Sequence, residues 1–152
     1  MAVKLSLLLK PELILLDMKQ TQRTEGIHEV ANLLANHPDI SNFQSFYEEL
    51  LARERVESTC LGNEVAFPHA RTDHVSGMIL AVGRSKEGVW FENCNQRVKF
   101  LFVIGTPKKM VTDYLAMIGS LARILRDDAI RESLLNAPTV EEFRAILLKT
   151  EK

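Results

Sequence analysis

Two groups of apolar residues near the N-terminus repeat at the spacing of an α-helix. They are Ile27, Val30, Ala31 and Leu34 in the first group and Phe43, Phe46, Tyr47, Leu50 and Leu51 in the second. His37-Pro38 lies between them, and the residue before a proline avoids the helical region. The pattern therefore predicts one helix that ends near residue 37 and a second that begins at a capping box of Ser41 and Gln44 and runs to about Arg53.

Short apolar runs of strand length follow a different period. The predicted extended segments are residues 13–16, 58–67 with a turn at Gly62-Asn63, 78–82, 89–91 and 98–104. The last of these runs is rich in Val, Ile and Phe, which is typical of a strand that is buried on both faces.

Helical spacing returns in the C-terminal third of the chain. After Pro107, one apolar stripe is formed by Tyr114, Met117, Ile118, Leu121 and Leu125. Asp127 or Asp128 is expected to cap a short helix, and Thr139 with Glu142 predicts a capping box for the last one. Strands interleaved with helices predict a layered α/β fold whose sheet is covered on both faces.

The composition narrows the class of protein. The 152 residues fit a single domain, 1–152, and 19 basic against 20 acidic residues give a net charge of -1. Such a balance does not indicate a nucleic-acid or anionic-membrane partner. The N-terminal LSLLLKPELILLDM is apolar, but Lys10, Pro11 and Glu12 interrupt it, so we expect neither a signal peptide nor a membrane anchor.

The two cysteines carry no sequence motif. Cys60 and Cys94 belong to no C-x-x-C pair and have no paired histidine nearby. We therefore expect small buried hydrophobic residues in a reduced, cytoplasmic protein, and neither a zinc site nor a redox motif.

The candidate chemistry lies in NEVAFPHARTDHV, residues 63–75, which holds two of the four histidines. Pro68 lacks an N–H, so the strand that ends at Phe67 is expected to stop there and to leave His69 on the following loop. A histidine held by a rigid predecessor loses little freedom on orienting, and much of it is neutral at pH 7. His69 is therefore the candidate nucleophile.

A longer pattern surrounds this histidine: Glu54, six residues, Leu61-Gly62, two residues, then VAFPHA. ARERVESTCLGNEVAFPHARTD resembles the stretch around the phosphorylated histidine in fructose/mannitol-type IIA domains of the bacterial sugar phosphotransferase system, a family that includes the nitrogen-regulatory IIA proteins. PELILLDMKQTQRTEGIHEVANLL, VKFLFVIGTP and LARILRDDAIRESLLNAPTVEEFRAILL extend the resemblance to practically the whole chain. The resemblance implies a three-layer fold with a mixed sheet of about five strands.

The resemblance also implies a chemistry. His69 would accept a phosphoryl group from the phosphohistidine of a small carrier protein and pass it to a separate IIB domain or act on a regulatory target, without a metal or small-molecule cofactor. Arg53 matches the family arginine that approaches the phosphoryl group, and its planar fork suits phosphate oxygens. Glu54 is expected to be structural, bonding the backbone or Arg53. Arg71 ranks lower than Arg53, because neighbours in an extended loop point apart.

One position departs from the family pattern. Sugar-transport members carry a second active-site histidine, and alignment through LARIL, residues 121–125, places Tyr114 there. A tyrosine donates a hydrogen bond but carries no positive charge at pH 7. His74 is more simply explained as an exposed loop residue than as a replacement imidazole. The domain is therefore either a carrier with weaker stabilisation of the phosphoryl group or a phosphorylation-deficient sensor that acts by binding a partner.

A hypothesis of a different class takes His69, Asp73 and His74 as three ligands of a catalytic metal ion. The spacing is short, and no H-x-x-x-H helix frames these residues, so the metal hypothesis ranks below the carrier and the sensor.

Overall fold

The computed structural model describes residues 4–149, which build one six-stranded mixed sheet. Its strands are β1 (Ile14–Leu15), β2 (Cys60–Gly62), β3 (Val65–Ala66), β4 (His69–Arg71), β5 (Ile79–Phe91) and β6 (Gln96–Thr106). Their order is β1-β5-β6-β3-β2, and β4 also pairs with β6. β5 runs antiparallel to β6, whereas β3 and β4 run parallel to it. The predicted mixed sheet is confirmed, with six strands in place of about five.

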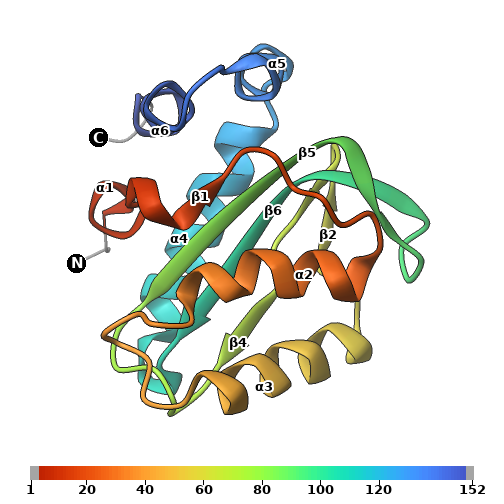
Figure 1. The fold of residues 1–152 in the computed structure, drawn as a ribbon. Helices are drawn as coiled ribbons and strands as arrows, with labels where there is room; N and C mark the ends of the chain where they lie inside the picture. Colours follow the sequence, from red (N-terminus) through yellow and green to blue (C-terminus); the bar gives the residue numbers. More distant parts are fainter. Residues whose placement is uncertain (1–3, 150–152) are drawn as a thin grey trace.

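Helices cover both faces of this sheet (Figure 1). The α-helices are α1 (Leu5–Leu8), α2 (Arg23–Ala31), α3 (Phe43–Val56), α4 (Val111–Leu125), α5 (Asp128–Asn136) and α6 (Val140–Leu148), and the 3-10 turns are η1 (Pro11–Leu13), η2 (Asn32–Leu34) and η3 (Lys108–Met110). α2 and α3 lie in front of the sheet in Figure 1, and α4 lies behind it.

The side chains of β6 point alternately to the two faces of the sheet, and apolar residues occur on both, which explains why helices must cover both faces. Leu101 and Val103 belong to the core cluster that includes the buried residues of α2 and α3. Phe100, Phe102 and Ile104 belong to the opposite cluster, with α4, α5 and α6. Successive side chains of a strand point to opposite faces, so an apolar run without alternation makes both faces apolar.

Local signals placed the starts of the last two helices correctly, whereas η2 ends at Leu34 and not near residue 37, and α3 runs past Arg53 to Val56. Asp127 and Thr139 cap α5 and α6 by accepting backbone hydrogen bonds. The second helix differs in detail, because Asn42 rather than Ser41 is its N-cap and accepts a hydrogen bond from the Ser45 N–H at 3.0 Å. The two segments predicted at 78–82 and 89–91 form one strand, β5, which is interrupted only by a register shift between Arg84 and Val89.

The expectation for the cysteines is wrong. Cys60 and Cys94 form a disulfide with their Cα atoms 6.6 Å apart, although 34 positions separate them in the sequence. Cys60 lies on β2 at one edge of the sheet, and Cys94 lies in the turn between β5 and β6. Only the strand order brings these two places together, so no spacing rule reveals the pair.

Among residues 4–149, no helix has the length and apolar character that crossing a membrane requires.

Candidate functional site

We expected His69 on a loop, but it is the first residue of strand β4. It pairs in register with Ile104 of β6, and the Pro68 carbonyl accepts a hydrogen bond from the Ile104 N–H at 2.9 Å. Pro68 therefore removes one donor without ending the alignment with β6, because its carbonyl still pairs. The central strand of the sheet thus fixes the backbone of His69.

The imidazole of His69 is oriented by a backbone carbonyl two residues earlier in the chain. Its Nδ1 lies 2.9 Å from the carbonyl oxygen of Phe67. A carbonyl oxygen only accepts hydrogen bonds, so Nδ1 carries the proton and Nε2 carries the free lone pair. Phe67 is itself held by its aromatic ring, which packs edge-on against Phe102 with centroids 5.4 Å apart. The ring nitrogen available as a nucleophile is therefore Nε2.

Burial lowers the pKa of His69 below its ordinary value of 6.5. The hydrogen bond to the Phe67 carbonyl and the charge of Glu54 oppose this shift, and the charges of Arg53 and Arg71 add to it. The imidazole is therefore neutral at pH 7, which is the protonation state that a nucleophile requires.

Tyr114 lies beside this ring. It belongs to the first turn of α4, and the centroids of the two rings are 5.1 Å apart. Burial raises the pKa of Tyr114, and the charges of Arg53 and Arg71 only partly oppose that shift. The phenol therefore keeps its proton at neutral pH. Among residues 4–149 its hydroxyl has no hydrogen-bond partner, so the O–H is not committed to another group of the protein.

Besides burial, the positive charges of Arg53 and Arg71 act on both His69 and Tyr114, in each case towards a lower pKa. Arg53, in the last turn of α3, donates from Nη1 to the Glu57 carbonyl oxygen at 2.9 Å. Arg71 lies two residues beyond His69 on β4, and residues i and i+2 of a strand face the same side. The expectation that Arg71 points away from His69 is therefore wrong, because it assumed a loop where the chain forms a strand.

The Glu54 carboxylate accepts a backbone hydrogen bond from the Thr59 N–H at 3.4 Å, as expected, and has further partners. Its buried carboxylate accepts hydrogen bonds from the Thr59 hydroxyl at 2.5 Å and from the Asn93 amide at 3.0 Å. Its ion pair is with Arg23, at 3.7 Å, and not with the adjacent Arg53. Neither Arg23 nor Asn93 is recognisable from sequence, since each lies more than 30 positions from Glu54.

Gly62 occupies the turn that leads from β2 into β3. Its φ of +95° lies in the region that favours glycine, and Asn63 and Glu64 follow with φ of 55° and 67°. The turn sends the chain back antiparallel, so that Cys60 pairs with Ala66, three residues before His69. Gly62 therefore supports the position of His69 through the backbone.

His74 belongs to a neighbouring cluster. Its Nε2 lies 3.8 Å from a Glu49 carboxylate oxygen, and its backbone N–H donates to the Thr72 hydroxyl. Asp73 pairs with Lys108 instead. Within the part of the chain that the structure describes, no three His, Cys, Asp or Glu side chains are grouped as a metal ion would require, which contradicts the metal hypothesis.

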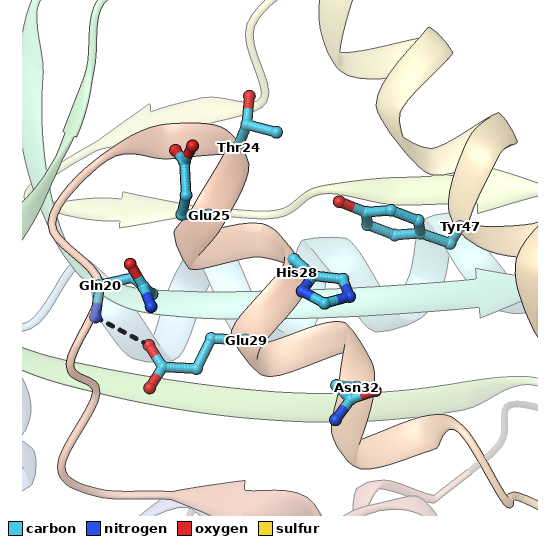
Figure 2. A pocket seen from close by; sticks show the side chains of 7 residues that line it. All are labelled: Gln20, Thr24, Glu25, His28, Glu29, Asn32 and Tyr47. Atoms are coloured by element: carbon cyan, nitrogen blue, oxygen red, sulfur yellow. Dashed lines mark hydrogen bonds between the residues drawn. The ribbon is translucent and has the colours of Figure 1, made fainter.

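A polar groove of about 490 Å³ lies on the side of α2 and α3 (Figure 2). Its lining residues are Gln20, Thr24, Glu25, His28, Glu29, Asn32 and Tyr47. The groove does not include His69, Arg53 or Tyr114, so the candidate site is separate from it.

The sequence and the fold both have relatives. Residues 7–150 match the model of the family described as the phosphoenolpyruvate-dependent sugar phosphotransferase system, EIIA 2. A nitrogen regulatory protein of Pseudomonas aeruginosa is 28% identical over 150 residues, which cover 98% of this chain and 97% of that protein. The fructose-specific EIIABC component of Bacillus subtilis is 28% identical over 99% of this chain, which spans only 24% of that longer protein.

A solved structure agrees with this assignment. The nitrogen regulatory protein IIA-Ntr of Neisseria meningitidis superposes with a TM-score of 0.83 and 32% identity, covering 91% of this chain and 94% of that one. Family match and fold point the same way, and the chain therefore belongs to the EIIA type 2 family of the phosphoenolpyruvate-dependent sugar phosphotransferase system.

Proposed function

We propose that this protein is a phosphoryl carrier that accepts a phosphoryl group on Nε2 of His69 from the phosphohistidine of a small carrier protein. The observation that carries the proposal is the 2.9 Å contact between His69 Nδ1 and the Phe67 carbonyl, which leaves Nε2 as the free nucleophile. In the transfer, the P–N bond of the donor breaks as the bond from phosphorus to Nε2 forms. Positive charge develops on the accepting ring, and the Phe67 carbonyl stabilises it.

The neighbouring groups suit the charge on the phosphoryl oxygens. Phosphoryl transfer passes through a loose transition state whose charge is spread over the equatorial oxygens, so that donors around them supply most of the catalysis. Arg53 and Arg71 would contribute two positive charges, and Tyr114 would donate a neutral hydrogen bond. No metal ion enters this mechanism.

Exposed apolar residues close in the chain to Arg53 and Tyr114 support a protein as donor. Val56 follows Arg53 by one turn and is 83% exposed, and Leu115 adjoins Tyr114 and is 61% exposed. Exposed apolar residues beside a charged centre are typical of a protein docking surface. We propose the phosphorylated carrier as donor, and a separate IIB domain or a regulatory protein as the later partner, in the cytoplasm where phosphoenolpyruvate is made.

A regulatory role is supported by the nitrogen-regulatory relatives, which match over nearly their whole length. We propose that residues 1–152 act as one EIIA type 2 unit in this role, since one continuous sheet joins the N-terminal and central parts of the chain.

A second candidate function keeps the fold and changes the chemistry. The phenol of Tyr114 is neutral at pH 7 and cannot become positively charged, so it lacks the charge that an imidazolium would bring. This observation favours a phosphorylation-deficient sensor, which would bind its partner without carrying phosphate.

Labelling with ³²P distinguishes the phosphoryl carrier from the phosphorylation-deficient sensor. The protein is incubated with ³²P-labelled phosphoenolpyruvate, the first enzyme of the system and the carrier protein. We expect an acid-labile label that His69→Gln abolishes and that His74→Gln, the matched control, retains. If the natural protein stays unlabelled while Tyr114→His is labelled, the sensor is the correct function.

A further inference from the structure

We propose that the Cys60–Cys94 disulfide is a redox-active pair whose reduction slows phosphoryl acceptance at His69. The inference rests on the proposed carrier function. The disulfide joins the edge strand β2 to the turn between β5 and β6, and a residue beside each cysteine is hydrogen-bonded to a residue adjacent in sequence or strand to the candidate site: Thr59 to Phe67, and Asn93 to Glu54.

The first connection runs through the backbone beside Cys60. The carbonyl of Thr59, the residue before Cys60, accepts a hydrogen bond from the Phe67 N–H at 3.0 Å. The carbonyl of Phe67 in turn accepts from His69 Nδ1 at 2.9 Å. Two hydrogen bonds therefore separate the residue next to the disulfide from the imidazole that would be phosphorylated.

The second connection runs through the buried carboxylate of Glu54. Its donors are Thr59, next to Cys60, and Asn93, next to Cys94. The disulfide thus ties together two segments that must both be in place for this carboxylate to be satisfied. Glu54 directly follows Arg53, whose charge acts on His69 and Tyr114. Loosening either segment would therefore affect both the nucleophile and its guanidinium neighbour.

The position of the disulfide suits exchange with a dithiol reductant. Both cysteines are only partly buried, and Cys94 lies between the exposed residues Asn93 and Asn95. Cys60 is on an edge strand that pairs with β3 alone, and both cysteines pack only at the margin of one core cluster, whereas most of the buried sheet residues belong to β5 and β6. Opening the disulfide therefore leaves the pairing of β5 with β6 in place and loosens the segments that support the site.

The chemistry is a two-electron exchange. A dithiol gives up two electrons and two protons, the S–S bond between Cys60 and Cys94 breaks, and the products are two protein thiols and the oxidised, cyclic disulfide of the reductant. Reduction frees residues 57–62, so that more of the molecules hold Phe67, His69 and Arg53 away from the productive arrangement. Small displacements of reacting groups lower transfer rates markedly.

The test compares two redox forms of the full-length protein. Thiol titration first verifies no free thiol in the oxidised form and two in the reduced form. Each form then receives phosphoryl groups from purified phosphorylated carrier in a single turnover, after removal of free reductant. We expect the reduced form to accept at least about threefold more slowly. The Cys60→Ser/Cys94→Ser variant is the control, and we expect it to match the reduced form and to ignore the redox treatment.

The other outcomes separate the two proposals. Equal rates, a faster reduced form, or two thiols that resist oxidation each overturn the redox inference and leave the carrier function intact. Absence of label on His69 in both forms instead refutes the carrier function, and the redox inference falls with it.

Discussion

Replacement of Tyr114 by phenylalanine isolates the contribution of one hydroxyl group. The ring remains, so the packing against His69, with centroids 5.1 Å apart, is preserved. Only the O–H is lost, and burial keeps that group protonated by raising its pKa. The substitution therefore removes a hydrogen-bond donor from the site and changes neither its net charge nor its shape.

The size of the effect follows from what the hydroxyl would contact. In the free protein it bonds no residue between 4 and 149, so its removal leaves the folded state nearly unchanged. In the transition state it would donate to a charged phosphoryl oxygen, an interaction of roughly 1.5–3 kcal/mol. The rate of acceptance should therefore fall by roughly 10- to 100-fold.

The assay is single-turnover transfer from purified phosphorylated carrier, with denaturant unfolding of each variant in parallel. We expect Tyr114→Phe to unfold within about 0.5 kcal/mol of the natural protein. Tyr114→His is the matched comparison, because it supplies an imidazole at the same position, and it should accept phosphate at least as fast as the natural protein. A Tyr114→Phe rate within about twofold of the natural one would refute the assigned role of the hydroxyl.

Three further predictions concern protonation, the buried carboxylate and the disulfide. Burial puts the pKa of His69 in the folded protein below 6.5, so the unfolded chain binds more protons between the two pKa values. The free energy of unfolding should therefore fall as pH drops through that window, and phosphoryl acceptance should have its inflection below pH 6.5. NMR titration of the ring measures the pKa directly. Glu54→Ala removes the buried acceptor that Thr59 and Asn93 share and should lower the free energy of unfolding by about 1–3 kcal/mol, which urea denaturation measures; a loss under about 0.5 kcal/mol would contradict this assignment. Cys60→Ser/Cys94→Ser opens a loop closed across 34 positions and should cost about 4 kcal/mol in the loop-entropy model, measured by comparing its urea denaturation with that of the oxidised protein.

Several features of the site were recognisable from sequence because their signals are local. The Pro-His step after an apolar run placed His69 beside a strand end, and the spacing from Glu54 through Gly62 to His69 identified the family. Tyr114 was found by alignment along one helix, where position in the helical repeat sets which face a residue occupies. The structure places His69 and Tyr114 in ring contact.

Other features needed the register of the sheet. A proline was expected to end pairing, but the Pro68 carbonyl still bonds Ile104, and His69 therefore begins a strand. That strand puts Arg71 on the same side as His69, which a loop would not require. The tautomer of His69 was likewise hidden, because it depends on where the Phe67 carbonyl lies in space.

The sequence by itself determined most of the alternation of helices and strands, the caps at Asp127 and Thr139, and the family, because periodicity and motif spacing are properties of short stretches. The tertiary structure alone decided which distant groups meet: Cys60 with Cys94, and Glu54 with Arg23 and Asn93. The physical reason is that such contacts depend on strand order and on the packing of both sheet faces, which arise only when the whole chain has folded.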